Sequence, residues 1–182
     1  RTDHDLAPAK RLGQMNLIVE VITANLRPAE WPITVKQILC FDRRLPKSIN
    51  EAILKVAQDN IGPVVGVDLA GPEINTEKTE EWIKLMSKAR ASGLKTTCHL
   101  GETSVDNVDP RFFTVLDRIG HGIHIPLAKP EYLKDLAKRQ ITLEVCPTSY
   151  RQTGVLKDFG DLRTVFARCR DAGVAVAVCT DN

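Results

Sequence analysis

Six short apolar runs alternate in this sequence with amphipathic stretches of helical periodicity, and that alternation narrows the fold to the α/β classes. Successive runs begin roughly 22 to 34 residues apart, about the length of one strand–helix unit. Most runs are continuously apolar, as expected for parallel strands that are covered on both faces. The predicted strands are 35–41, 64–69, 95–100, 118–121, 141–146 and 174–179.

Two α/β architectures fit this pattern. A (β/α)₈ TIM barrel repeats strand and helix with this period, and six units would form an incomplete barrel. A doubly wound open sheet is the alternative, but no glycine-rich phosphate-binding fingerprint follows the first strand. No low-complexity linker divides the chain, so we predict one partial barrel domain over residues 1–182.

Helices are expected between the strands, starting at residues that commonly cap or begin a helix. Ser48 and Glu51 have the spacing of a capping box. Other expected starts are Thr76, Asp109 with Pro110, Pro130 and Asp161. A further helix is expected over 14–25, with Leu17, Ile18, Val21 and Ala24 on its buried side.

Composition excludes several functional classes. The net charge is +2 with both signs mixed, which argues against a dedicated nucleic-acid or membrane surface. The basic cluster Arg43, Arg44 and Lys47 is interpreted as a solvated loop and helix start. The five cysteines contain no CxxC pair, so neither a disulfide framework nor a structural zinc site is indicated. A reducing compartment, and hence a cytoplasmic location, is the simplest expectation.

Polar residues gather where the predicted strands end. In a barrel these carboxyl ends meet at one rim, where catalytic groups lie. The residues are Gly71, His99, Glu102, His121, His124, Thr148, Ser149 and Asp181.

Two of these residues are suited to a catalytic zinc ion. His99 and Asp181 offer nitrogen and oxygen ligands of the kind that zinc binds while it keeps one position for water. Either residue alone would more often be structural, and two ligands do not complete a site. Further imidazole ligands would therefore have to come from elsewhere.

Glu102 and His121 are candidates for the catalytic groups. Glu102 follows His99 by three residues and could act as a general acid or base, although a carboxylate that favours a helix N-terminus is the alternative. His121 lies between two glycines that permit close approach, and it could orient an attacking water. His124 is interpreted as a supporting or surface histidine.

Five segments, in this order, resemble the adenosine deaminase family of metal-dependent amidohydrolases, and the resemblance covers nearly the whole chain from about Ile33 onward. It implies a (β/α)₈ barrel and one zinc ion per active site. The segments are VVGVDLAGPE at 64–73, HLGE at 99–102, RIGHGIH at 118–124, LEVCPTS at 143–149 and TD at 180–181.

The resemblance implies a role for each matching residue. His99 and Asp181 correspond to metal ligands, Glu102 to the proton donor to purine N1, and His121 to the group that positions the zinc-activated hydroxide. Gly71 corresponds to the glycine whose N–H meets purine N3. The implied reaction is hydroxide attack at C6 of adenosine or deoxyadenosine, which gives inosine or deoxyinosine and ammonia.

Three departures from the family pattern affect these expectations. The family's HxH pair is absent because the resemblance places residues 1–182 from just before the third barrel strand to just after the eighth-strand Asp181, so this stretch alone is not expected to hold zinc catalytically. Asn182 replaces a second Asp that contacts purine N7, and its amide can still donate a hydrogen bond. Tyr150 follows the CPTS segment where many bacterial relatives have Asn, and a change at the pocket rim is expected.

Several functional alternatives stay open at this point. The substrate could be adenine, N6-methyl-AMP or another 6-aminopurine, and Arg151 is a weak candidate for a phosphate contact. A non-catalytic purine-binding relative and an inactive fragment are further alternatives. The expected partner is a small-molecule purine nucleoside, with no nucleic acid and no membrane, and the sequence indicates no oligomeric state.

Overall fold

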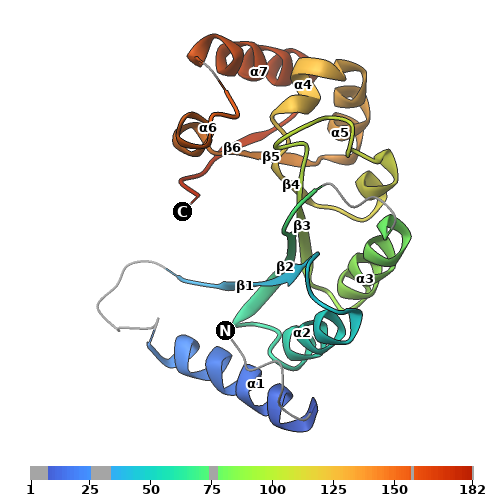
Figure 1. Ribbon diagram of the computed structural model, residues 1–182, viewed down its shortest axis with the longest axis vertical. Helices are drawn as coiled ribbons and strands as arrows, with labels where there is room; N and C mark the ends of the chain where they lie inside the picture. The colour runs from blue at the N-terminus through green and yellow to red at the C-terminus, as the bar shows by residue number, and fades with distance from the viewer. Residues whose placement is uncertain (1–7, 26–33, 74–77, 157, 182) are drawn as a thin grey trace.

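The computed structural model describes residues 8–25, 34–73, 78–156 and 158–181 and contains a six-stranded sheet in which all neighbouring strands are parallel. The sheet curves as an arc in Figure 1. Its strands are β1 (Gln37–Asp42), β2 (Val64–Ala70), β3 (Lys95–Leu100), β4 (Arg118–His121), β5 (Thr142–Val145) and β6 (Val176–Val178).

The strand order distinguishes the two expected architectures. The strands lie in the sheet in the same order as in the sequence, β1 to β6. A doubly wound sheet reverses its order at a switch point, whereas a barrel adds each strand beside the previous one. The chain therefore folds as six consecutive strand units of a (β/α)₈ barrel, as the sequence predicted.

Helices follow the strands and cover the convex side of the arc, where α2, α3, α5 and α7 lie (Figure 1). None of the described helices is long and apolar enough to cross a membrane. The α-helices are α1 (Pro8–Asn25), α2 (Lys47–Asp59), α3 (Thr79–Ala91), α4 (His124–Ala128), α5 (Leu133–Arg139), α6 (Pro147–Thr153) and α7 (Phe159–Ala172), and the 3₁₀ helices are η1 (Pro110–Thr114) and η2 (Pro130–Tyr132).

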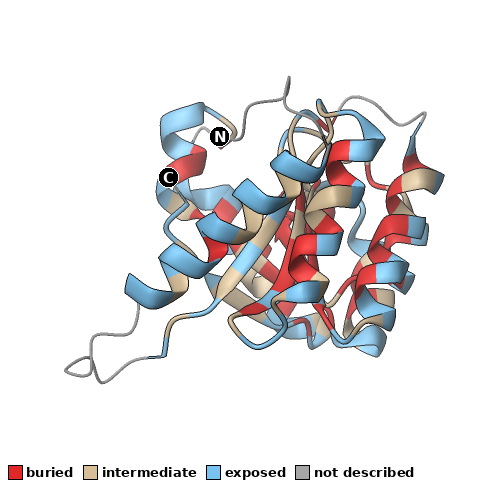
Figure 2. Ribbon diagram, turned by 90° about the horizontal axis from the view of Figure 1, so that it is seen from below, coloured by how far each residue is buried: buried red, intermediate tan, exposed pale blue. Residues whose placement is uncertain are grey.

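The core lies between the sheet and these helices. Figure 2 shows buried residues along the strands and on the helix faces that turn toward them. Phe41 of β1, Leu69 of β2, Ile119 of β4, Leu143 of β5 and Met86 of α3 are completely buried. This apolar layer fixes the strand ends and therefore the positions of the polar residues that follow them.

The predicted capping box at the start of α2 is wrong. The helix begins at Lys47, which places Ser48 inside its first turn, and no side chain caps its N-terminus. The fully buried Asn50 holds this corner instead. Its Oδ1 accepts the Asp42 N–H at 3.0 Å, and its Nδ2 donates to the Asp42 carbonyl at 3.0 Å. These bonds tie α2 to the end of β1 and replace a local cap.

The predicted buried face of α1 is also wrong. Leu17 and Val21 are 58% and 52% exposed, whereas Val19 is buried. Leu12, Met15 and Val19 pack against the core. Beside them, Asn16 accepts a hydrogen bond from Asn60 at the end of α2, and Thr23 accepts one from Gln37 of β1. The helix therefore docks by the face that carries these groups.

The remaining helix starts agree in part with the predictions. Asp109 caps η1 by accepting the Arg111 N–H at 2.9 Å, although the element is a 3₁₀ helix. Asp158, rather than Asp161, caps α7. Pro130 begins η2, which leads into α5. Thr76 lies outside the described residues.

Candidate active site

The predicted functional residues converge at the carboxyl ends of β2 to β6. Strand register places these ends side by side, since His99 pairs with Gly120 and Leu100 pairs with His121. His121 and Asp181 have φ of 63° and 61°, which is left-handed backbone that non-glycine residues seldom adopt. Such conformations cluster at functional sites, where the surrounding structure holds them in place.

A carboxylate on the neighbouring strand holds the ring of His99. The Nδ1 atom of His99 lies 3.1 Å from Asp68 Oδ2 and 3.2 Å from Asp68 Oδ1. Because a carboxylate only accepts hydrogen bonds, Nδ1 carries the hydrogen and Nε2 keeps its lone pair. Metal-ligating histidines usually have this arrangement, so the donor set fits a zinc ligand at Nε2. The hydrogen bond with Asp68 also raises the pKa of His99.

Asp68→Asn is expected to lower the pKa of His99, because the charged hydrogen-bond partner is lost. The pair favours the protonated ring in the folded state, so its stabilisation is present below a pH of about 6.5 and is lost as pH rises through the pKa of His99. NMR titration of the histidine rings in zinc-free protein would measure the change, with the His124 ring as internal reference. An unchanged His99 pKa would contradict this assignment.

Glu102 and His121 form a second pair. The Nε2 atom of His121 lies 3.6 Å from Glu102 Oε2. Burial raises the pKa of Glu102, the charge of His99 opposes this effect, and the charge of Asp181 adds to it. Burial lowers the pKa of His121, and the charge of His99 lowers it further. Both directions favour the neutral forms, a carboxyl that can donate a proton beside an imidazole that can accept one.

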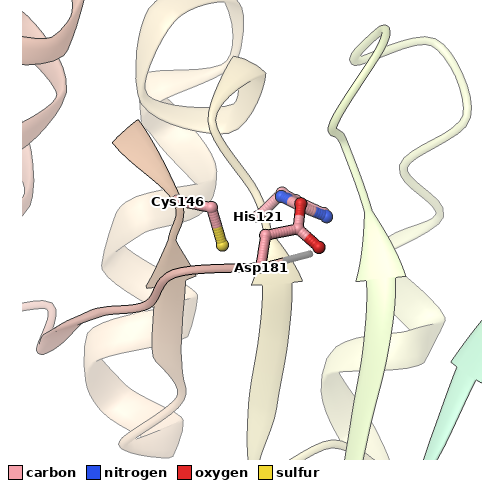
Figure 3. Close-up of side chains that lie close together, drawn as sticks. All are labelled: His121, Cys146 and Asp181. Carbon is pink, nitrogen blue, oxygen red and sulfur yellow. The ribbon is translucent and has the colours of Figure 1, made fainter. Parts of the chain in front are cut away.

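His121, Cys146 and Asp181 form a compact group, in which potential ligand atoms lie within 4.8 Å of one another (Figure 3). These residues come from the ends of β4, β5 and β6, and the buried Nδ1 of His121 has no hydrogen-bond partner among the described residues. His99 is not in this group, but its ring centroid lies 4.9 Å from that of His121. Burial raises the pKa of Cys146 to about 12, so its thiol is protonated in the metal-free site.

Tyr150 lies beneath the site rather than at its rim. Its side chain is completely buried, its hydroxyl oxygen accepts the Cys146 N–H at 2.9 Å, and its ring packs edge-on against His121 at 5.6 Å between centroids. The tyrosine therefore supports both the turn after β5 and the His121 ring.

Tyr150→Phe is expected to lower the free energy of unfolding by about 1–3 kcal/mol, because the buried Cys146 N–H loses its acceptor. Tyr132→Phe is the matched control, since the Tyr132 ring packs edge-on against Phe113 and should change by less than about 0.5 kcal/mol. Urea denaturation of both variants measures the difference. Equal stability of the two variants would contradict a structural role for the Tyr150 hydroxyl.

Gly71 occupies a position that only glycine fits well. Its φ is +93°, and a Cβ there would lie 2.8 Å from Asp42 Oδ1 and 3.2 Å from the Arg43 backbone nitrogen. Arg43 is correspondingly not the solvated loop residue that the sequence suggested. Its Nη1 donates to the Gly71 carbonyl at 2.9 Å and its Nη2 donates to the His99 carbonyl at 2.7 Å. Arg44 and Lys47 are exposed, as predicted.

Other predicted residues lie near the same edge without entering these contacts. His124 is half-buried at the start of α4, Thr148 is exposed, and Ser149 is buried in α6. Arg151 stacks over the Phe159 ring at 5.7 Å. Asn182 lies outside the described residues.

Sequence reasoning missed three charged residues that organise the site. Asp68 holds His99, Arg43 joins two strand ends, and Glu73 accepts the N–H groups of Gly101 and Glu102 at 2.9 and 3.1 Å. One signal was available, because a charged residue inside the apolar run 64–69 is unusual and indicates a specific partner.

A barrel-type sheet with imidazole and carboxylate groups at its carboxyl edge has the arrangement of a TIM-barrel enzyme site. The chain belongs to the adenosine deaminase family, whose family model, described as "Adenosine deaminase", matches residues 8–182. The chain spans about half the length of the curated relatives that it matches.

Three known proteins illustrate the similarity. An adenosine deaminase of Enterococcus faecalis is 33% identical over 97% of this chain and 53% of its own length. An adenine deaminase of Sphingopyxis alaskensis is 34% identical over 79% of this chain and 43% of its own length. An amidohydrolase from Burkholderia ambifaria, whose crystal structure contains bound zinc, matches this chain with 27% sequence identity and a TM-score of 0.74. The match covers 89% of this chain and 46% of the amidohydrolase.

Proposed function

We propose that this protein catalyses the zinc-dependent hydrolytic deamination of adenosine or deoxyadenosine. The observation that carries the proposal is the pair formed by Glu102 and His121, 3.6 Å apart and next to His99 and Asp181. Family membership supports a hydrolytic deaminase, and relatives named for adenosine and for adenine narrow the substrate to 6-aminopurines.

Each residue then has a defined task. His99, through Nε2, and Asp181, through its carboxylate, would contribute to holding zinc. Zinc, when bound, supplies a hydroxide nucleophile near neutral pH. Glu102 in its protonated form donates to purine N1, which makes C6 electrophilic. His121 orients the nucleophile toward C6 and accepts a hydrogen bond through its neutral ring.

Two further groups would recognise the purine ring. Gly71, in left-handed backbone in the turn after β2, would offer its N–H to purine N3. Asn182 would donate its side-chain amide to N7. Both contacts are hydrogen bonds to the purine ring and not to the sugar, so they could form equally with adenosine, adenine and N6-methyl-AMP.

The experiment is an amine-release assay on protein expressed from the complete coding sequence, with zinc present. Adenosine, deoxyadenosine, adenine and N6-methyl-AMP are compared, the first three by ammonia and the last by methylamine. We expect rapid ammonia release from adenosine and deoxyadenosine. Faster turnover of adenine or N6-methyl-AMP would move the substrate within the class. Purine binding without amine release, in a protein that contains zinc, would favour a binding protein instead.

A further inference from the structure

A buried carboxylate from a neighbouring loop holds the turn that presents Glu102. Glu73, which is 8% exposed, follows Gly71 in the loop after β2. Its Oε2 accepts the Gly101 N–H at 2.9 Å, and its Oε1 accepts the Glu102 N–H at 3.1 Å. One side chain thus binds two successive backbone amides of the turn after β3, and one of them belongs to Glu102 itself.

Arg43 binds carbonyl groups of the same two loops, whereas Glu73 binds N–H groups of the turn after β3. Its guanidinium donates to the carbonyls of Gly71 and His99 at 2.9 and 2.7 Å. The loop after β2 and the turn after β3 are therefore joined twice, by a carboxylate on N–H groups and by a guanidinium on carbonyl groups. Charge-assisted bonds of this kind are stronger than neutral ones, and their burial limits exchange with water.

We propose that Glu73 is a positioning residue that fixes Glu102 relative to the purine-contacting Gly71; the functional half of this inference rests on the proposed deaminase activity. Gly101 has φ of +72°, so the turn uses backbone that is easily displaced when its hydrogen bonds are lost. Proton donation by Glu102 to a purine held against Gly71 then depends on the geometry of this one unit. A displacement of about 1 Å in such a unit can cost about 100-fold in rate.

Glu73→Gln tests the proposal with little change in volume. The Gln oxygen can accept one amide N–H, whereas its NH₂ group would face the other donor. Glu131→Gln is the matched control, because Glu131 is exposed in η2. Amide hydrogen exchange by NMR on protein from the complete coding sequence reports on Gly101 and Glu102 directly. Core-strand amides such as that of Ile119 serve as the internal reference.

We expect exchange of the Gly101 or the Glu102 amide to accelerate about 10- to 100-fold in Glu73→Gln and to stay unchanged in Glu131→Gln. Unchanged exchange at both amides would overturn the proposal. If Glu73→Gln does not fold, amide proton chemical shifts of the wild-type protein test the proposal instead. Downfield amide proton shifts of Gly101 and Glu102 would support the bonds to the carboxylate, and shifts typical of solvent-exposed amides would overturn them.

Steady-state kinetics distinguish a role in positioning Glu102 from a role in holding the whole site, including zinc, together. In Glu73→Gln we expect kcat to fall at least about 10-fold, with KM within about 3-fold of wild type and zinc content unchanged. Loss of zinc together with kcat would overturn the positioning role in favour of general support. If wild-type protein deaminates no 6-aminopurine, the proposed function fails, and the exchange experiment still tests whether Glu73 holds the turn.

Discussion

Glu102→Gln is expected to lower kcat by about 10²–10⁴-fold, the usual contribution of a positioned proton donor, while the zinc content stays unchanged. Gln has nearly the same shape as Glu and can occupy the site near His121, but it has no carboxyl proton to transfer. The raised pKa of Glu102 gives this substitution a large effect, because burial and Asp181 keep the carboxyl protonated to higher pH than an ordinary glutamate. Steady-state kinetics with metal analysis on the same sample provides the measurement.

A surface substitution controls for charge and handling. Glu51→Gln changes an exposed carboxylate on α2 and should leave kcat unchanged. Normal turnover by Glu102→Gln would remove Glu102 from the mechanism. A parallel loss of zinc would show instead that Glu102 supports the metal site.

His99→Ala is expected to lower the affinity for zinc. Loss of a residue that only hydrogen-bonds to a metal ligand costs roughly 10–100-fold in affinity, and loss of the ligand itself should cost more. The substitution removes Nε2 and leaves the Asp68 carboxylate without the ring that it holds. Competition with a chromogenic chelator on protein from the complete coding sequence measures this affinity. Turnover should fall with zinc occupancy.

His124→Ala is the matched control for this histidine. His124 lies at the start of α4, where its backbone N–H donates to the Gly101 carbonyl, and that bond does not need the imidazole. Its replacement should leave zinc affinity close to that of wild type. Full zinc occupancy in His99→Ala at limiting zinc would refute the role of His99 as a ligand.

Strand positions were predictable from this sequence because the apolar runs recur at the spacing of one strand–helix unit. The expected burial on both faces does not hold throughout, since Ile38 of β1 and Val178 of β6 are 51% and 70% exposed. Two of the strands, β3 and β4, begin and end at the predicted residues. The docking face of α1 was predicted wrongly because the helix carries apolar residues on more than one side, and the side with Leu12, Met15 and Val19 is the one that packs against the core. Periodicity reports which face of a helix is apolar, but not which neighbour is available to cover it.

The site was predictable as a set of strand-end residues and not as a set of contacts. His99 and His121 lie at the ends of predicted strands and Asp181 lies just after one, so the sequence alone indicates these positions. Arg43 and Glu73 bind backbone atoms of residues 28 or more positions away, and no local sequence pattern encodes such pairs. Arg43 was predicted to lie in a solvated loop, as most arginines in such clusters do. Its hydrogen-bond partners are seen only in the folded chain.

Because consecutive strands carry separate parts of this site, some of its loops depend on their neighbours more than others do. Each strand unit from β4 to β6 brings one member of the His121, Cys146 and Asp181 group. These units are joined by lighter contacts, such as the ring contact between His121 and Tyr150. The first three units behave otherwise, because Arg43 and Glu73 join their strand ends. Exchange of a single loop is therefore expected to disturb the site less after β5 or β6, whereas the loops after β1, β2 and β3 would have to be transferred together.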